Sequence, residues 1–501
     1  MNFKHIFSQI QSWISNHPLI FLIVIAIGVR LIGINAPIIG VHAWRQADTA
    51  AIARNFYENG FNFLYPQIDW GGSGEGFCET EFPIYSFLVA MLYRVVGAQD
   101  FLGRLLSVAC AIVGLCGLYQ LTERFFERRA AFWACFFYAL LPLLIYYTRT
   151  FQPESMLVMC SIWGVLYFKK WIDQGQTSAL LISNLFVTIA CLIKVLPLVY
   201  LGLPIAFLAW SRWGWKMFRM PQLWGYAVMP LVSVFLWYSH AHEIFLTYGN
   251  TFGFSGASTD RYDYRILLTW YFWSEILVKV AVRQFAIFGF FIFLVGCSLP
   301  KRNLQEWIFP VWLGASVLCW IAVPVTSVVH EYYHLNFMIP GVILMGKACA
   351  HYLNPKLYSV KSTQRRAIVT CISLALVASA AFYSIDYRSK ENVDKSLVFE
   401  LAQQVKSNTE PNAKIIATTG GDPSLLYLAH RKGWIINPMA LTSQWIKEKQ
   451  TQGARYLVGS FGFVESYVLS VDDNQKRAIE AAMQQGDRLQ VRDNFIVKLR
   501  P

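Results

Sequence analysis

Asp48 follows the first long apolar run of this chain, at the end of the motif His42 to Asp48 (HAWRQAD). Ionisable groups at the edge of a membrane are costly to keep, so they usually mark a reaction site or a transport pathway. A carboxylate in such a place is able to exchange a proton with a reacting group. The position therefore indicates a membrane enzyme. The structural alternative is that Asp48 only caps the helix that we expect at residues 48–57.

Other polar residues fall beside the same face of the expected membrane domain. Arginine near the end of a span often reaches for lipid head groups, and tyrosine often belongs to an aromatic belt, so these structural roles stay open. Because acids, bases and cations nevertheless converge on one face, we expect a site there. The residues in question are Arg45, Glu79, Glu81, Arg104, Arg149, Glu154, Lys194, His330, Tyr332 and Tyr333.

The elements that must position these residues are mostly membrane helices. The 501 residues are 55% hydrophobic and only 15% charged, whereas a soluble domain carries roughly 25% charged residues. Apolar runs long enough to cross a hydrocarbon core of about 30 Å recur along the chain. We therefore predict a polytopic α-helical membrane protein with about 11 transmembrane helices, at residues 18–37, 101–121, 130–147, 153–170, 176–193, 196–210, 221–240, 284–299, 306–325, 335–352 and 367–384.

Charge bias orients these spans. If the short apolar segment 83–97 is an interfacial or re-entrant helix, one side of the membrane receives 15 basic residues against three acids, with Lys4, Lys356 and Lys361 among them. By the positive-inside rule that side is cytoplasmic, so we predict a multi-pass protein of the cytoplasmic (inner) membrane with its N-terminus inside. The net charge of +13 comes mostly from these basic residues on the predicted cytoplasmic side. It favours anionic membrane lipids as partners, and no motif indicates nucleic acid.

The composition becomes that of a soluble domain near residue 385. We predict a transmembrane domain at 1–384, with an outer first loop at 38–100, and a small extracytoplasmic α/β domain at 385–501. Nine of the ten cysteines lie in predicted spans, so no disulfide framework follows. Alternation of elements supports the α/β layer, with strands expected at 413–418, 433–436, 454–458 and 489–498 and helices at 424–429, 442–449 and 474–484.

The order of these features resembles the GT-C membrane glycosyltransferases. An outer acidic loop follows the first span, and then come an Arg-bearing span, an Arg-x-x-x-x-Glu turn at 149–154, a Leu-x-Lys turn at 192–194 and a His-x-Tyr-Tyr motif at 330–333. The nearest branch is that of the protein O-mannosyltransferases and aminoarabinose transferases, with their bacterial relatives. The resemblance covers about residues 1–384.

This resemblance implies transfer of a hexosyl or pentosyl group from a polyprenyl-phosphate-linked donor. The acceptor is the hydroxyl of a lipid, glycan or protein on the outer face, and the anomeric carbon is inverted. By position Asp48 is the general base, and Glu154 orients the acceptor or Arg149. The donor phosphate would be bound by Arg104, Arg149 and Lys194, and substrate contacts would come from Arg45, Glu79, Glu81, His330, Tyr332 and Tyr333.

The chain departs from many members of the branch at two positions. Thr49 stands where they have Glu, and Glu81 stands where they have Lys, so phosphate contacts do not transfer directly to the second position. Glu79, Glu81 and His330 could gather a divalent metal. The branch needs no metal for its chemistry, so we expect no cofactor.

Two other functions stay open. A lipid-linked oligosaccharide ligase would place its key residues in a large late outer loop, which is short here, at 326–334. A non-enzymatic lipid or sugar transporter would show internal repeats and polar groups near mid-membrane, whereas the polar residues of this chain gather at one face.

Overall fold

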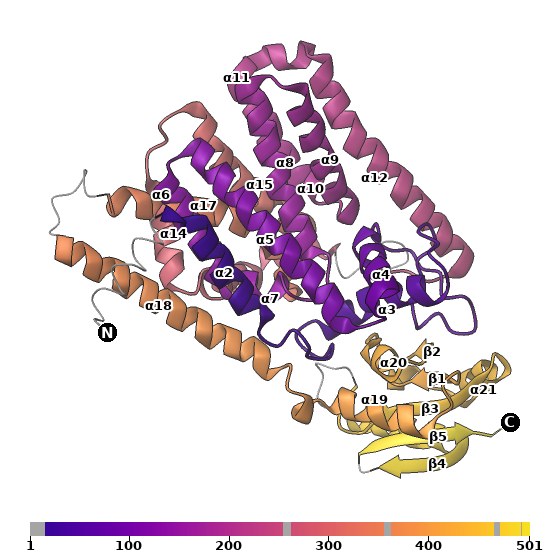
Figure 1. The fold of residues 1–501 in the computed structure, drawn as a ribbon. Coiled ribbons are helices and arrows are strands. Elements are labelled where there is room, and N and C mark those ends of the chain that lie inside the picture. The colour runs from indigo at the N-terminus through magenta and orange to yellow at the C-terminus, as the bar shows by residue number, and fades with distance from the viewer. Residues whose placement is uncertain (1–15, 254–261, 355–361, 465–470, 492, 501) are drawn as a thin grey trace.

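Long helices run side by side in the computed structural model, and a small sheet lies at one end of them (Figure 1). The structure describes residues 16–253, 262–354, 362–464, 471–491 and 493–500. Lys4, Lys356 and Lys361, on which part of the predicted charge bias rests, lie outside the described residues, as does the N-terminus.

Each predicted span corresponds to a helix or to two successive helices. Proline stands in the first turn of several of them, where its missing N–H costs nothing. Proline also divides the predicted span 130–147, because Pro142 cannot continue the hydrogen bonds of the preceding helix. The helices are α2 (Pro18–Leu31), α5 (Asp100–Phe125), α6 (Arg128–Leu140) with α7 (Pro142–Tyr147), α8 (Glu154–Gln174), α9 (Thr177–Ile193), α10 (Pro197–Tyr200) with α11 (Gly202–Trp213), α12 (Pro221–Tyr248), α14 (Phe288–Ser298), α15 (Ile308–Ala322), α17 (Leu335–Tyr352) and α18 (Ser362–Ser389).

Within the described residues, three helical segments are long and apolar enough to cross a membrane by themselves: Asp100–Phe125, Leu304–Ala322 and Val369–Ser389. A fourth is added if Trp270–Gln284 and Phe288–Ser298, bent by 104° relative to each other, form one broken span. Helix α12 also exposes Leu231, Phe235 and Leu236, as a lipid-facing helix would. The helical membrane fold is thus supported, while the count of 11 spans stays a prediction.

The segment 83–97 forms helix α4 (Ile84–Val96). Its 13 residues extend about 20 Å at 1.5 Å per residue, which is less than the roughly 30 Å of the hydrocarbon core. This length agrees with an interfacial helix, and the topology that depends on it stays a prediction. The remaining short elements are α13 (Trp270–Val278), α16 (Pro324–Val329), η1 (Gly214–Arg219), η3 (Tyr264–Leu268), η4 (Lys279–Gln284), η5 (Leu304–Trp307), η6 (Glu331–His334), η7 (Val393–Lys395) and η8 (Pro438–Ala440).

Helix α3 (Ala43–Glu58) differs from the helix expected at 48–57. It begins at Ala43, and His42 occupies the N-cap position with a φ of 53°. Asp48 therefore lies inside the helix, and the alternative that it is only an N-cap is wrong. The small residues Ala47, Ala50 and Ala53 are fully buried, so α3 packs on all sides and is not an exposed amphipathic helix.

The C-terminal part forms a five-stranded sheet in the order β2-β1-β3-β5-β4. The strands β1 (Lys414–Ala417), β2 (Gly433–Ile435) and β3 (Ala454–Ser460) are parallel, as their apolar sequences favour. The strand predicted at 489–498 is instead a hairpin of β4 (Gly486–Val491) and β5 (Asn494–Leu499), with Leu489 opposite Ile496. The predicted helices correspond to α20 (Ser424–Ala429), α21 (Ser443–Thr451) and α22 (Asp473–Met483), and α19 (Leu397–Asn408) precedes them.

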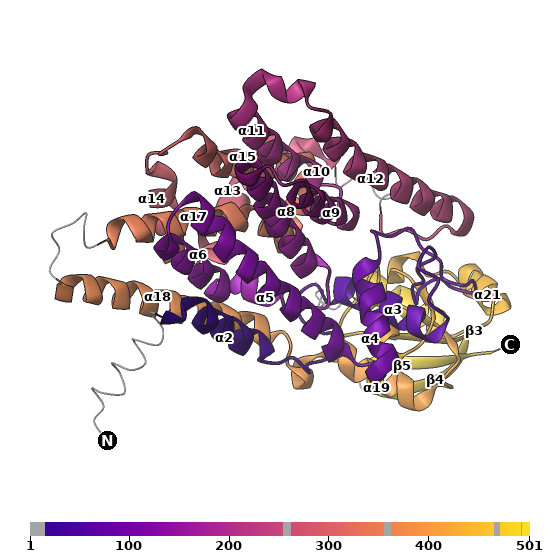
Figure 2. The ribbon, with the colours of Figure 1, turned by 45° about the horizontal axis from the view of Figure 1, so that its top comes forward.

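The C-terminal part docks on the loop at residues 38–100, and its helix α20 packs beside α3 (Figure 2). The amide of Gly433 donates to the carbonyl of Asp69 at 2.9 Å, and the amide of Gly72 donates to the carbonyl of Gly433 at 2.8 Å. Gly72 has a φ of +66°, and a Cβ there would lie 2.5 Å from Nε1 of Trp434, so glycine is required. Helix α18 runs to Ser389, past residue 384, and the predicted domain division there stays a prediction.

Candidate functional site

A cavity of about 580 Å³ lies where the first outer loop, the turn after α9, the segment around η6 and the C-terminal sheet meet. This volume is in the usual range for a small-molecule site, roughly 300–1,000 Å³. We call it the Asp48 pocket. It brings together seven of the residues expected from the sequence, namely Arg45, Asp48, Glu81, Lys194, His330, Tyr332 and Tyr333.

Asp48 is held in this pocket by α3 and is only 5% exposed. Its Oδ1 accepts a hydrogen bond of 3.0 Å from the indole Nε1 of Trp70. Burial, the largest effect, raises the pKa of Asp48 to about 7, although the Trp70 hydrogen bond and the Arg45 charge act in the opposite direction. A carboxyl group with this pKa can accept a proton and release it again near neutral pH, as a general base must.

Lys194 is the buried cation of the pocket. It follows the last residue of α9, and its Nζ donates to Oε1 of Glu154 at 2.8 Å. The same Nζ lies 4.6 Å from the ring centroid of Tyr332 and 4.5 Å from that of Tyr333. Burial, the largest single effect, would lower the pKa of the Lys194 ammonium, but the charge of Glu154 together with Tyr333 and Glu81 outweighs it, so the pKa is raised. Lys194 therefore stays charged at neutral pH.

Arg45 lies one turn before Asp48 on α3 and forms an ion pair with Glu81. Its guanidinium also lies 5.4 Å from the ring centroid of Phe252, which lines the pocket. Glu79 is set back from the cavity, where it accepts a hydrogen bond from the hydroxyl of Thr251. Glu79 thus fixes the 251–253 segment of the wall and does not itself line the pocket.

Glu154 is completely buried at the start of α8, behind Lys194. Its Oε1 accepts from Lys194, whereas its Oε2 has no hydrogen-bond partner among the described residues. Arg149 pairs with Glu391 and Glu154 pairs with Lys194, so the structure does not support the alternative that Glu154 orients Arg149, and the alternative that it orients the acceptor stays a prediction. In this structure Glu154 positions Lys194.

Neither Arg104 nor Arg149 lines the Asp48 pocket, and their expected phosphate role stays a prediction. Arg104 donates to the carbonyls of Gly33, Ile34 and Pro37. Arg149 donates to the carbonyls of Ile32 and Gly33 in addition to its ion pair with Glu391. Both guanidinium groups donate hydrogen bonds to backbone carbonyls of the turn between α2 and α3, which is a structural role.

His330 forms part of an aromatic wall. Its ring stacks on Tyr332 with centroids 5.3 Å apart and an interplanar angle of 9°, and it lies 5.6 Å from the ring of Trp44. Within the part of the chain that the structure describes, no group of three or more His, Cys, Asp or Glu side chains is arranged to hold a metal ion. The expectation that the chemistry needs no metal stays a prediction.

The sequence did not indicate two parts of the pocket. Trp70, the hydrogen-bond partner of Asp48, stands next to the Gly71-Gly72 turn, and no spacing connected it with Asp48. Gly420 and Gly421 bring the C-terminal sheet to the edge of the pocket. The only signal for them was a Gly-Gly pair after a predicted strand, which is a weak indication of a ligand site.

Comparison with known proteins agrees with this arrangement. Residues 80–238 match the family described as dolichyl-phosphate-mannose-protein mannosyltransferase. No curated protein matches the chain in sequence.

Solved structures resemble the chain over most of its length. ArnT from Cupriavidus metallidurans, bound to undecaprenyl phosphate, superposes with a TM-score of 0.61 at 12% identity, over 95% of this chain and 97% of ArnT. The oligosaccharyltransferase of Archaeoglobus fulgidus, with zinc and sulfate, also gives a TM-score of 0.61 at 12% identity, over 88% of this chain and 68% of that one. The oligosaccharyltransferase AglB of the same organism, with an inhibitory peptide and dolichol-phosphate, gives 0.58 at 11% identity, over 97% and 75%.

The fold and the family match confirm the resemblance found in the sequence. The chain shares its fold with ArnT and with the archaeal oligosaccharyltransferase. Residues 80–238 also match the dolichyl-phosphate-mannose-protein mannosyltransferase family.

Proposed function

We propose that this protein transfers a sugar from a polyprenyl-phosphate-linked donor to an acceptor hydroxyl at the outer face of the membrane. The observation that carries the proposal is that a buried carboxylate, Asp48, and a buried ammonium, Lys194, line one cavity. A base for the acceptor and a cation for the leaving phosphate are the two groups that the reaction needs.

In the proposed reaction the acceptor oxygen attacks the anomeric carbon while Asp48 takes the hydroxyl proton. The new carbon–oxygen bond forms as the bond to the donor phosphate breaks, and the electron pair of that bond moves to the phosphate oxygen. Lys194 and Arg45 stabilise the negative charge that develops on the leaving phosphate. The Lys194 ammonium has three N–H donors, and one of them donates to Glu154. A single displacement of this kind inverts the anomeric carbon.

Transfer of an oligosaccharide is the second candidate, because the fold is as similar to the archaeal oligosaccharyltransferase as to ArnT. The chain spans 97% of ArnT but only 68% of that oligosaccharyltransferase. Transfer of a single sugar is therefore favoured.

The test is a donor panel. We expect the purified protein to release polyprenyl phosphate from at least one undecaprenyl-phosphate-linked hexose or pentose when cell-envelope extract supplies the acceptor. Polyprenyl phosphate would be measured by mass spectrometry. Turnover of a pyrophosphate-linked oligosaccharide only would favour the second candidate, and no turnover of any lipid-linked donor would contradict both.

The raised pKa of Asp48 predicts the pH dependence of transfer. Because the base acts in its ionised form, kcat/KM should rise about tenfold per pH unit up to about pH 7 and then level off. The stability of the folded state depends on pH in the opposite direction to kcat/KM. The folded state holds this proton more tightly than the unfolded state does, so the contribution of Asp48 to stability increases as the pH falls from 7 towards 4. A profile that stays flat between pH 5 and 8 would contradict the assignment of the base.

A further inference from the structure

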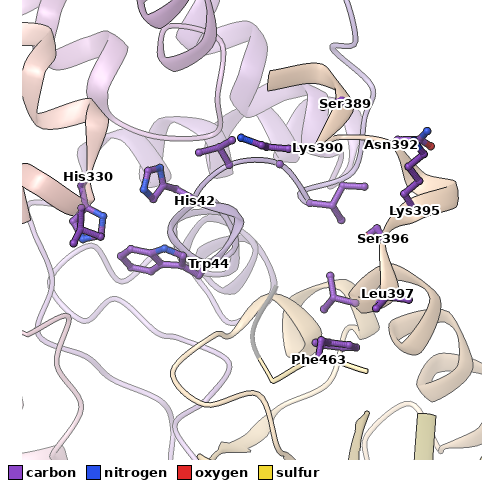
Figure 3. A pocket seen from close by; sticks show the side chains of 15 residues that line it. His42, Trp44, His330, Ser389, Lys390, Asn392, Lys395, Ser396, Leu397 and Phe463 are labelled. Atoms are coloured by element: carbon purple, nitrogen blue, oxygen red, sulfur yellow. The ribbon is translucent and has the colours of Figure 1, made fainter. Parts of the chain in front are cut away.

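A second cavity, of about 640 Å³, lies beside the Asp48 pocket (Figure 3). It is enclosed by the segment Ile39 to Trp44, by His330, by the linker from Ser389 to Val398 and by Phe463 of the C-terminal domain. We call it the linker cavity. Trp44, Val329 and His330 line both cavities, so the two cavities adjoin.

The linker cavity is electropositive. Its charged lining residues are Lys390 and Lys395, and no acid is among the described residues that line it. The amino end of Lys390 turns toward His42 (Figure 3). Its Nζ lies 3.7 Å from Asp386, which is itself bonded to Arg283 at 2.9 Å. Lys390 is thus only weakly neutralised.

The other walls suit a sugar. The rings of His42, Trp44, His330 and Phe463 line the cavity (Figure 3), and rings with a few polar groups are the usual lining of a small-molecule site. Burial lowers the pKa of His42 to about 4, so this ring is neutral at physiological pH. The two lysines therefore supply the charge of the cavity.

The position of the cavity relative to Asp48 assigns it to one of the two substrates. Trp44 precedes Asp48 by one turn on α3, and residues four apart lie on the same face of a helix. Because Trp44 lines both cavities, a ligand in the linker cavity lies next to the pocket that holds Asp48. Lys194 lines the Asp48 pocket and not the linker cavity, so the donor phosphate belongs to the pocket.

We propose that the linker cavity binds the acceptor and that the acceptor is a sugar bearing a phosphate or carboxylate group, which Lys390 and Lys395 hold while a hydroxyl of the sugar reaches Asp48. This assignment rests on the proposed function, because it takes Asp48 as the base.

The test measures binding by the purified full-length protein without donor, so it does not depend on turnover. The probes are glucose 6-phosphate, glucuronate, glucose and inorganic phosphate, titrated by calorimetry. We expect both anionic sugars to bind at least about tenfold more tightly than glucose or phosphate alone, a difference of about 1.4 kcal/mol. The double variant Lys390→Ala/Lys395→Ala should bind them no better than glucose. The double variant with arginine at both positions should restore binding.

The matched control is Lys406→Ala/Lys476→Ala, which removes two lysines of the same domain that do not line the cavity. It should bind the anionic sugars as the wild type does. Equal binding by the wild type and the Lys390/Lys395 alanine variant would overturn the proposal. The acidic peptide acetyl-Glu-Ser-Glu amide provides a second check. If it competes for the cavity as well as glucose 6-phosphate does, the proposal is also overturned. A last arm compares phosphatidylcholine nanodiscs with and without phosphatidylglycerol. Displacement of glucose 6-phosphate by the anionic lipid would assign the lysines to lipid head groups and overturn the sugar acceptor.

Discussion

Replacing Asp48 with asparagine is expected to lower the turnover of sugar transfer by about 10²–10⁴-fold, the contribution of a general base. Asparagine has the same shape, and its carbonyl can accept the hydrogen bond that Trp70 donates to Asp48. It cannot take a proton at neutral pH. Burial already disfavours the charged form of Asp48, so loss of the charge should leave the folded state intact.

The measurement is the initial rate of polyprenyl phosphate release by purified Asp48→Asn, together with its thermal unfolding. The control is Asp473→Asn, which makes the same chemical change at a side chain that is 92% exposed in the C-terminal domain. It should keep wild-type turnover. Near-normal turnover by Asp48→Asn would exclude Asp48 as the base and would require another proton acceptor.

Asp48 and Lys194 could be found from the sequence because each follows an apolar run, where a charged side chain is costly to keep and usually has a function. Trp70, the hydrogen-bond partner of Asp48, could not be found in this way. Trp70 and the Gly420-Gly421 turn reach the pocket only through the docking of the C-terminal sheet on the first loop. Long-range backbone contacts of this kind leave no periodicity in a sequence.

Arg149 shows that the partner of an arginine at the end of a span cannot be predicted from the sequence. An arginine at the end of a span looks the same in sequence whether it faces a ligand or a structural partner. The partner of Arg149 is Glu391, which lies 242 positions later and beyond the last predicted span. The helices themselves were predicted well because long apolar runs specify them. The N-terminus of α3 was missed because His42 is an unusual N-cap residue.

Lys194 is the second residue whose loss should have a large effect, and its test must separate chemistry from folding. Lys194→Ala would leave the Glu154 carboxylate buried without its partner, and breaking such a pair typically costs about 3–5 kcal/mol of stability. Loss of activity in that variant would be ambiguous. The variant Lys194→Met/Glu154→Gln removes both charges together, keeps the volumes similar and avoids an unpaired buried charge.

We expect Lys194→Met/Glu154→Gln to fold and to lose about 10²–10³-fold in kcat/KM for the donor, as enzymes do when one donor that stabilises developing negative charge is removed. Binding of the anionic sugar probes should not change, because Lys194 does not line the linker cavity. Donor kinetics would be measured as polyprenyl phosphate release over a range of donor concentrations.

The chain contains a closely matched control for this variant. Lys347 and Glu306 form a second buried pair, on the predicted cytoplasmic side, with an Nζ to Oε2 distance of 2.8 Å. Their side chains are 6% and 1% exposed, compared with 8% and 1% for Lys194 and Glu154. Each glutamate also has one buried oxygen without a partner among the described residues. Lys347→Met/Glu306→Gln should therefore perturb packing to a similar extent and leave donor kinetics unchanged. An equal loss in both double variants would show that buried ion pairs matter here only for the rigidity of the helices, and unchanged donor kinetics in the Lys194 variant would remove Lys194 from the phosphate site.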